Sequence, residues 1–280
     1  MTRSDNSTMM TVVAFKWQRI HTGMQLPSTV DEYGPEHVNI LYRSIARNTT
    51  VPFRFVCVTD DPVGLRDDIE IVDLWDRCRD IGGCYNRLYM FSSDMREILG
   101  TDRFIAIDLD AVVVSNIDHI LTMTDDFVIN EYDIANNNHA THQYYNGGII
   151  MMDVGSRERV WRDFDPIVSP GIIQPRKDAI ELVGSDQAWI SHTLGPGERT
   201  LTPADGVYDY RKLPNKKVLP ENAAIVMFAG RRDPLTEFRH NKWIQTHWRG
   251  SSLDMESVYK KTKRSQRGFK KQRRMKRPTR

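Results

Sequence analysis

Two carboxylates interrupt a hydrophobic stretch near the middle of the chain. Residues 104–107 and 111–114 are apolar, and Asp108-Leu109-Asp110 lies between them. On an extended chain, residues two positions apart point to the same side, so both carboxylates face one place. Like charges held together are unfavourable unless a cation lies beside them. An oxygen-only pair suits Mg²⁺ or Mn²⁺, so the pattern predicts a divalent-cation site at Asp108 and Asp110. The alternative is a solvated strand end.

The elements around these aspartates alternate between strands and helices. Apolar runs predict strands at residues 11–16, 53–58, 69–74 and 103–107. Helical spacing predicts one helix that opens at Pro35 and another that carries Leu88 to Leu99 and ends at Gly100. This order is typical of an α/β domain with a mostly parallel central sheet, covered on both faces. In such sheets ligands bind beyond the carboxyl ends of the strands, where Asp108 and Asp110 stand.

The charge is divided unevenly along the chain. The 280 residues carry a net charge of +2, but residues 260–280 hold twelve Lys or Arg and no Asp or Glu. The remaining residues therefore carry 2 − 12 = −10. We expect a flexible N-terminus at 1–10, one catalytic domain at 11–250, and a basic, disordered tail at 251–280 that can bind a polyanion.

Composition also argues against several classes of protein. No run of about 18 apolar residues is present, so we expect no transmembrane segment. The first residues lack the apolar centre of a secretory signal, and Cys57, Cys78 and Cys84 lack zinc-like spacing. We expect free thiols and a cytoplasmic location.

Two classes of enzyme carry Asp-x-Asp at the end of a strand. In dehalogenase-like phosphatases the first aspartate, here Asp108, is the nucleophile. The residues after their motif are typically Gly-Thr, whereas Ala111-Val112 follow here. In nucleotide-sugar glycosyltransferases the pair holds the metal that grips the diphosphate of the donor.

Further segments favour the second class. In chain order they are FKWQR, YGPEHVNILYRSIARN, FRFVCVTDDPVGL, GCYNRLYMF, IDLDAVVV, YNGGIIMMDVGSRERVW, GSDQAWI, GVYDYRKL and IVMFAGRRDP. Together they resemble glycosyltransferases of the GT-A fold, in particular the glycogenin and galactosyltransferase-like group, over roughly residues 11–235. The resemblance implies a single GT-A (Rossmann-like) domain, a nucleotide-sugar donor that is a UDP-sugar by default, and a requirement for Mn²⁺ or Mg²⁺.

The resemblance also implies roles for individual residues. Asp110 ligates the metal, and Asp108 shares the metal or touches the ribose. Asp186 and Gln187 lie near the reacting carbon of the sugar. The donor is held by Lys16, Trp17, Asp60, Arg87, Asn146, Gly147, Gly148, Arg231 and Arg232.

Several of these residues have an ordinary structural alternative. Asp60 suits an Asx-turn before Pro62, and Trp17 suits simple core packing. Arg87 can instead be a solvated charge on the surface of a helix. Ser185 and Asp186 are residue types that favour the N-terminus of a helix.

The closing segment departs from the family it resembles. Related enzymes carry a histidine there as a third metal ligand, often followed by a lysine. Here Met227-Phe228-Ala229-Gly230 contains no histidine, and Asp233 stands in place of the lysine. His139, His142 and His240 are other candidates for the third ligand. A catalytically inactive, nucleic-acid-binding relative stays an alternative.

The acceptor is suggested only by the basic tail. A glycan hydroxyl is one acceptor class, and a hydroxylated DNA base is another, with residues 260–280 contacting the nucleic acid.

Overall fold

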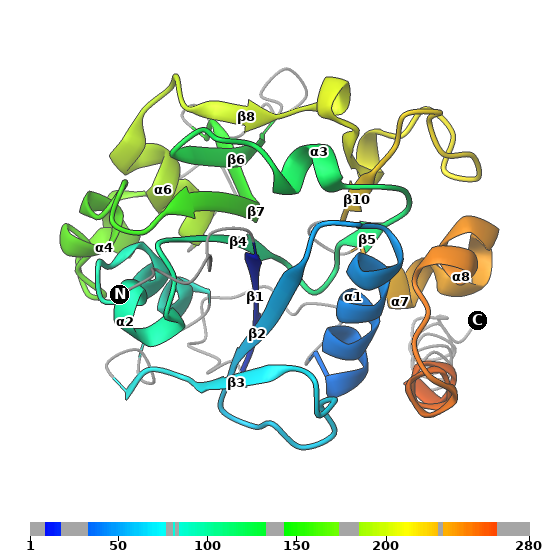
Figure 1. Ribbon diagram of the computed structural model, residues 1–280. Coiled ribbons are helices and arrows are strands. Elements are labelled where there is room, and N and C mark those ends of the chain that lie inside the picture. The colour runs from blue at the N-terminus through cyan, green and yellow to red at the C-terminus, as the bar shows by residue number, and fades with distance from the viewer. Residues whose placement is uncertain are drawn as a thin grey trace, which may run out of the picture.

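The structure, a computed structural model, describes residues 9–17, 33–76, 81, 84–132, 143–173, 185–228 and 232–261. Its centre is a seven-stranded sheet in the order β3-β2-β1-β4-β7-β6-β8 (Figure 1). The strands are β1 (Met10–Lys16), β2 (Phe53–Thr59), β3 (Glu70–Asp73), β4 (Arg103–Ile107), β6 (Phe127–Glu131), β7 (Tyr145–Asp153) and β8 (Arg199–Leu201). β7 runs antiparallel to β4 and β6, and the other four pairings are parallel. The predicted α/β fold with a mostly parallel sheet is confirmed.

A small second sheet brings the closing segment beside Asp110. It has the order β5-β10-β9, with β5 (Val112–Val113), β10 (Ile225–Met227) and β9 (Val207–Asp209). β10 runs antiparallel to β5, with Val226 opposite Val112. The chain that leaves β10 therefore passes next to the turn that carries the two aspartates.

Helices cover both faces of the large sheet (Figure 1). α1 (Pro35–Arg47) packs Val38, Leu41 and Ile45 on one face. The 3₁₀ helix η2 (Tyr85–Phe91), α2 (Met95–Leu99), α4 (Arg159–Arg162) and α6 (Asp186–Leu194) cover the other. The remaining helices are α3 (Asp118–Leu121), α5 (Ser169–Ile172), α7 (Pro234–Glu237), α8 (Lys242–His247), η4 (Pro203–Asp205), η5 (Tyr210–Lys212) and η6 (Phe238–His240).

The prediction of one continuous helix from Leu88 to Leu99 is wrong. The segment forms two helices, because Ser92 leaves η2 in an extended conformation, and its hydroxyl accepts a hydrogen bond from the Asp94 backbone N–H. Serine and aspartate compete for backbone hydrogen bonds and so favour turns over helix interiors. Of the apolar side chains predicted to share one face, Leu88, Phe91, Met95 and Leu99 are nevertheless buried, and Ile98 is partly buried.

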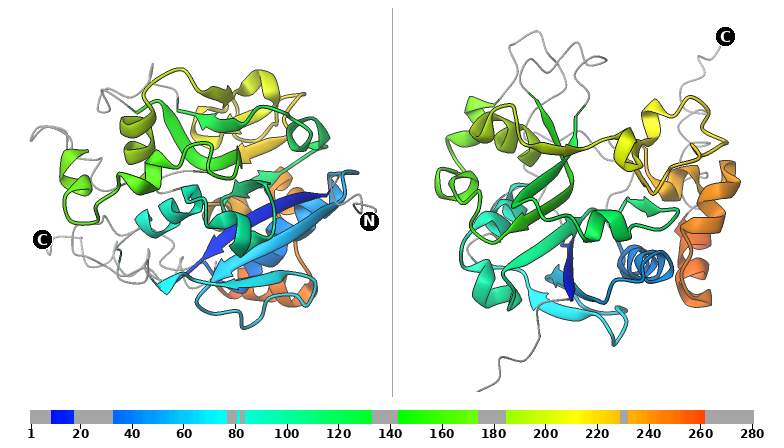
Figure 2. Two further views of the ribbon diagram at one scale, coloured as in Figure 1. Left: turned by 60° about the vertical axis from the view of Figure 1, so that its left-hand side comes forward. Right: turned by 45° about the horizontal axis from the view of Figure 1, so that its top comes forward.

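The C-terminal residues correct the predicted start of the tail. Residues 252–261 are helical, and α1 lies between this helix and the sheet (Figures 1 and 2). Val258 is fully buried, Asp254 accepts a hydrogen bond from Asn39, and Lys261 pairs with Glu36. This packing explains why the tail does not begin at residue 251. Residues 262–280 lie outside the described residues, and Met10, predicted to be flexible, begins β1.

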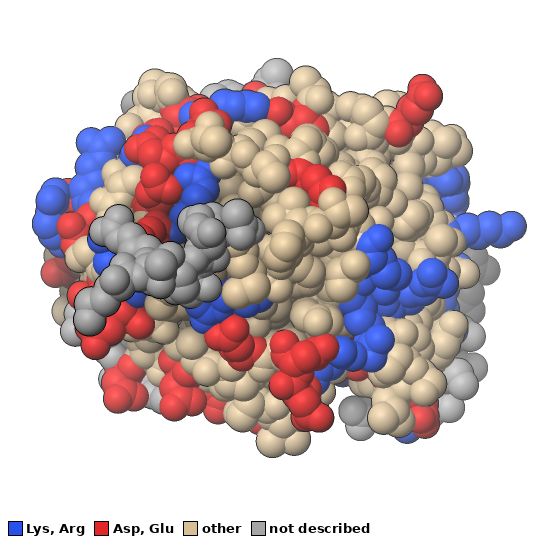
Figure 3. All heavy atoms as spheres, viewed as in Figure 1, with Lys and Arg blue, Asp and Glu red and all other residues tan. Residues whose placement is uncertain are grey.

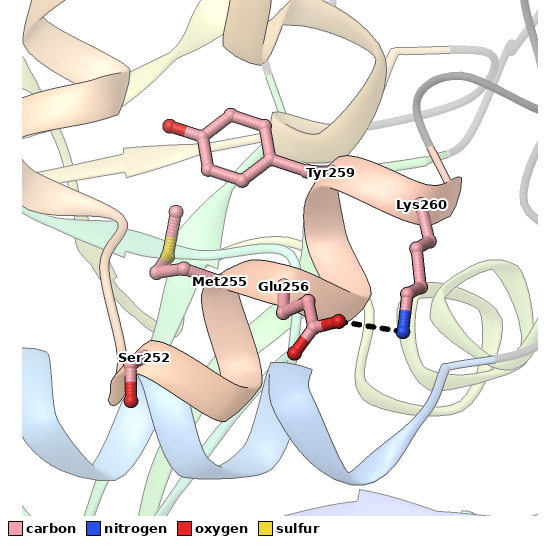
Figure 4. A pocket seen from close by; sticks show the side chains of 5 residues that line it. All are labelled: Ser252, Met255, Glu256, Tyr259 and Lys260. Carbon is pink, nitrogen blue, oxygen red and sulfur yellow. Dashed lines mark ion pairs between the residues drawn. The ribbon is translucent and has the colours of Figure 1, made fainter.

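Two further expectations concern membranes and thiols. No described helix is both long and apolar enough to cross a membrane. Cys57 and Cys84 are free, as predicted, whereas Cys78 lies outside the described residues. A hollow of about 510 Å³ lies along the helix 252–261 (Figure 4). Its lining comes from that one helix and includes the Glu256–Lys260 ion pair, so we assign it no chemistry.

Candidate functional site

Arg87 joins the two acidic segments that the sequence marked. Its guanidinium forms ion pairs with Asp108, at the end of β4, and with Asp186, the first residue of α6. It also donates a hydrogen bond to the carbonyl of Gly147 at 3.0 Å. Arg87 is only 8% exposed. Although burial opposes its charge, Asp108 and Asp186 raise the pKa of Arg87. The alternative of a solvated helix charge is therefore wrong.

The start of β7 approaches this arginine closely. A Cβ on Gly147 would lie 2.3 Å from Arg87 Nη2 and 3.2 Å from Asp186 Oδ2. A Cβ on Gly148 would lie 2.4 Å from Met227 Cε and 2.9 Å from Asn146 Oδ1. Only glycine fits at either position without a shift of its neighbours. The predicted glycines thus line the same site as Arg87.

The first turn of α6 lies against this glycine backbone. Ser185 caps the helix by accepting a hydrogen bond from the Ala188 N–H, as its type predicts. Asp186 is 4% exposed and faces Arg87, while Gln187 Oε1 accepts from the Gly147 N–H at 3.4 Å. The structural interpretation of Ser185-Asp186 as a helix start is therefore confirmed, and the roles of Asp186 and Gln187 near the sugar stay a prediction.

Asp110 sits in a less satisfied environment than Asp108. Its Oδ2 accepts a hydrogen bond from the Tyr33 hydroxyl at 3.3 Å, and its Oδ1 is buried with no hydrogen-bond partner in the described structure. Burial, followed by the charges of Asp108 and Asp233, raises the pKa of Asp110 well above its usual value. A bound cation would offset the free-energy cost of keeping this buried carboxylate charged.

The remaining predicted donor residues lie at several places. Lys16 ends β1, is 6% exposed, and donates to the Asp61 carbonyl at 2.6 Å. Trp17 packs edge-on against Phe15 in the core and is partly buried. Asp60 is exposed, and the Asx-turn there is formed by Asp61, which accepts from the Val63 N–H. Arg232 pairs with Glu237, and Arg231 lies outside the described residues.

The candidate third metal ligands stay unassigned. His139 and His142 lie outside the described residues, and His240 is exposed at the end of η6. Across the described ranges, no group of three or more His, Cys, Asp or Glu residues is placed to hold a metal ion. Asp110 nevertheless fits a hard cation, because it offers a buried, unpartnered carboxylate oxygen and Asp108 raises its pKa.

Sequence reasoning missed several residues at this site. The Tyr33 hydroxyl donates a hydrogen bond to Asp110, and the Met227 side chain lies against Gly148. The charge of Asp233 helps to raise the pKa of Asp110. Cys84 lies close to Asp186, and burial, followed by the charge of Asp186, raises the pKa of its thiol to about 12. Only Met227 and Asp233 carried a signal in the sequence, as departures from the closing motif.

Solved structures with the same arrangement of elements are glycosyltransferases. The galactosyltransferase LgtC, in complex with donor and acceptor sugar analogues, matches with a TM-score of 0.55 at 12% identity. The match covers 87% of this chain and 98% of LgtC. A glutamine-to-glutamate active-site mutant of LgtC matches with a TM-score of 0.51 at 12% identity, over 81% of this chain and 89% of that one.

A further match is the glycosyltransferase GlyE of Streptococcus pneumoniae TIGR4. Its TM-score is 0.52 at 11% identity, over 91% of this chain and 64% of that one. No family model and no curated protein matches the sequence. At such low identity the likeness establishes the fold, and the chain has the GT-A fold found in LgtC and these other glycosyltransferases.

Proposed function

We propose that this protein is a metal-dependent glycosyltransferase that moves a sugar from a nucleotide-sugar, by resemblance a UDP-sugar, to an acceptor hydroxyl. One observation carries the proposal. Arg87 gathers Asp108 from the end of β4, Asp186 from the start of α6, and the Gly147 backbone from β7. The GT-A fold, established above, supports assigning this convergence to sugar transfer.

Each residue has a task that follows from charge. In the transfer, the acceptor oxygen bonds to the anomeric carbon, and the bond from that carbon to the diphosphate oxygen breaks. The diphosphate keeps the electron pair, and the acceptor proton passes to solvent. A divalent cation, when bound, supplies positive charge to the leaving diphosphate. Arg87 presents a guanidinium fork, which suits the oxygens of the donor phosphates. Asp108 and Asp186, which pair with Arg87, suit the hydroxyl groups of the sugar.

Gln187 suits the face of the sugar next to Gly147. Its amide oxygen already reaches the Gly147 N–H, at 3.4 Å. LgtC has been solved as an active-site mutant in which a glutamine is replaced by glutamate, which supports a site role for a glutamine in this fold. We therefore assign Asp186 and Gln187 to positioning the donor sugar at its reacting carbon.

The donor assignment is tested by calorimetry with UDP and GDP, with and without Mn²⁺. We expect metal-dependent binding of one nucleotide diphosphate. Asp110→Asn should lower transfer by about 10²–10³, the usual cost of losing one well-placed electrostatic group. The Asp209→Asn variant, at the end of β9 in an ion pair with Arg211, is the matched control. Absence of metal-dependent binding for every nucleotide would leave the chain as an inactive relative.

The alternative phosphatase activity has a direct test. A dehalogenase-like enzyme would hydrolyse an aryl phosphate and form a phosphoryl bond at Asp108. In this structure Asp108 is paired with Arg87, and the matching folds are those of glycosyltransferases. We expect no aryl-phosphate turnover, and turnover lost in Asp108→Asn would favour the phosphatase instead.

A basic surface supports a polyanionic acceptor. Lys and Arg side chains gather over α1 and the segment after α8 (Figure 3). Arg43 and Arg249 stand close enough to Arg47 that, after burial, their charges lower its pKa. The helix 252–261 ends at Lys261, which pairs with Glu36 at the first turn of α1. The described chain therefore ends beside the first turn of α1, close to Gly34.

We propose that residues 260–280 bind nucleic acid and that a hydroxylated base, or otherwise a glycan, is the acceptor. On duplex DNA, each neutralised phosphate contributes about −0.9 to the log–log dependence of affinity on salt. We expect a slope of several units, and deletion of residues 262–280 should abolish it while donor hydrolysis persists. Lack of binding at low salt would leave a glycan hydroxyl as the acceptor.

A further inference from the structure

Three buried polar atoms without hydrogen-bond partners in the described structure belong to side chains that are linked around Asp110 by Tyr33 contacts and by charge. They are Asp110 Oδ1, Asp233 Oδ2 and His37 Nε2. Leaving such a group unsatisfied costs about 1–3 kcal/mol, so native proteins rarely tolerate it. Three of them from separate elements indicate a place that a ligand completes.

Tyr33 connects two of these groups. Its hydroxyl donates to Asp110 Oδ2 at 3.3 Å, while its ring packs edge-on against His37 at 5.0 Å between centroids. His37 is fully buried in the first turn of α1, and its Nδ1 accepts a hydrogen bond from the Gly34 N–H. Its Nδ1 also lies 3.3 Å from Glu36 Oε1, and its Nε2 has no hydrogen-bond partner in the described structure.

The second sheet brings Asp233 to the same place. β10 pairs with β5, which begins two residues after Asp110, and Asp233 stands at the start of α7, where it is 3% exposed. One carboxylate oxygen of Asp233 accepts from the Leu235 N–H and caps α7, which leaves the other oxygen unpartnered. Asp233 thus has one structural oxygen and one that the described fold does not use.

Met227 fills the position of the histidine that the closing segment lacks. A Cβ on Gly148 would lie 2.4 Å from Met227 Cε and 3.4 Å from Asp108 Oδ2, so Met227 and Asp108 approach the same point of β7. A thioether is a soft, weak ligand for Mg²⁺ or Mn²⁺, which prefer oxygen. The charge that a third ligand supplies must therefore come from another residue.

We propose that Asp233 is the third carboxylate of the cation site, acting on an ion held by Asp108 and Asp110 through a water molecule in the ion's shell. Direct ligation does not fit, because no three such side chains in the described chain can hold one ion together. Mg²⁺ usually keeps several of its waters, and Asp233 Oδ2 and His37 Nε2 would orient one of them. The inference rests on the proposed donor site, since the same Asp-x-Asp pair holds the ion.

The charges around Asp233 agree with this arrangement. The charges of Asp108 and Asp233 act on Asp110, and Arg87 and Lys261 supply neighbouring positive charge to Asp110 and Asp233 respectively. Arg87 is already paired with Asp108 and Asp186, and Lys261 with Glu36. The carboxylates of Asp110 and Asp233 therefore share a local excess of negative charge that a divalent cation balances.

The test measures Mn²⁺ binding to the full-length protein without any donor, by electron paramagnetic resonance of the free ion. Asp233→Asn keeps the helix cap, because asparagine caps as well as aspartate, but removes the charge. We expect its affinity for Mn²⁺ to fall about 10-fold or more, as for other groups that support a metal site from outside the direct ligands. Asp209→Asn, which also caps a short helix, is the matched control and should bind like the wild type.

A second variant tests the position of Met227. Met227→His adds an imidazole beside Asp108 and should raise the affinity for Co²⁺ relative to Mg²⁺ by about 10-fold. Unchanged Mn²⁺ binding in Asp233→Asn, with binding lost in Asp110→Asn, would overturn the inference and leave the donor site intact. If the wild type binds no Mn²⁺ with or without UDP, the proposed function fails as well.

Discussion

The two sides of the site differ in how completely their charges are balanced. On the Arg87 side, one guanidinium pairs with Asp108 and Asp186 and also reaches a backbone carbonyl. On the Asp110 side, Asp110, Asp233 and His37 each keep a buried polar atom without a partner in the described structure. The first side is preorganised before any ligand arrives, whereas the second is stable only at a cost that a bound cation would remove.

This difference assigns separate tasks to the two sides. A network with all partners in place holds its geometry, which favours positioning of the donor sugar. An unbalanced cluster attracts an ion of the opposite charge, which favours capture of the metal and diphosphate. We therefore expect the stability of the fold to depend on the balanced side, and turnover to depend on the residues next to the reacting atoms.

The largest effect is expected for Arg87→Ala. Removing one partner of a buried ion pair leaves an uncompensated charge and typically costs about 3–5 kcal/mol of unfolding free energy. Asp186, at 4% exposed, would be that charge. Urea unfolding followed by circular dichroism measures the loss. Arg162→Ala, which breaks a fully exposed pair with Asp163, should leave stability close to that of the wild type. Equal losses in both variants would contradict the balanced network.

Asp186→Asn separates positioning from stability. The side chain keeps its shape at the start of α6 but loses the charge that faces Arg87. We expect transfer to fall by about 10²–10³ while affinity for the nucleotide diphosphate is kept, because the interaction acts mainly at the reacting centre. Ser185→Ala removes the cap of the same helix, so it should cost about 0.5–2 kcal/mol of stability with normal activity per folded molecule. If the two variants behave alike, Asp186 is only a helix residue.

The sequence predicted the balanced side better than the unbalanced one. Strands β1, β2 and β4 were visible as apolar runs, and Asp108, Arg87 and Asp186 lay in segments with recognisable order. The ion pairs between them join residues 21 and 99 positions apart, and no periodicity reports such a distance. The break at Ser92 was also hidden, because the apolar spacing continues across it.

The unbalanced side depends on contacts that sequence patterns do not express. Asp110 meets Tyr33 across 77 positions, and Asp233 arrives only because β10 pairs with β5. The helix 252–261 was not predicted, because the basic residues next to it in the sequence favour disorder. Buried Val258 and the hydrogen bond to Asp254 hold this helix in place. Burial of these few residues outweighs a composition that favours disorder.

Glu36 gives a smaller effect that depends on pH. Burial opposes its charge, but His37 and Lys261 together lower the pKa of Glu36 to about 2, from an ordinary value of 4.5. A lowered pKa stabilises the fold above pH 4.5, and this contribution is lost as the pH falls towards 2. Glu36→Gln should therefore be up to about 3 kcal/mol less stable at pH 6, and the difference from the wild type should shrink below pH 4.5. A difference that stays constant with pH would mean that packing, not charge, explains it.

The smallest effect is expected for Tyr33→Phe. The change removes a single hydrogen bond to Asp110, at 3.3 Å, and keeps the ring that packs on His37. A hydrogen bond to a charged group contributes about 1.5–3 kcal/mol, and a long one falls at or below the lower limit. Because this bond favours the ionised carboxylate, its loss should weaken Mn²⁺ binding only a few-fold, with Tyr42→Phe as the control outside the site. A loss as large as that of Asp110→Asn would mean that Tyr33, rather than the balance of carboxylate charge, organises this side of the site.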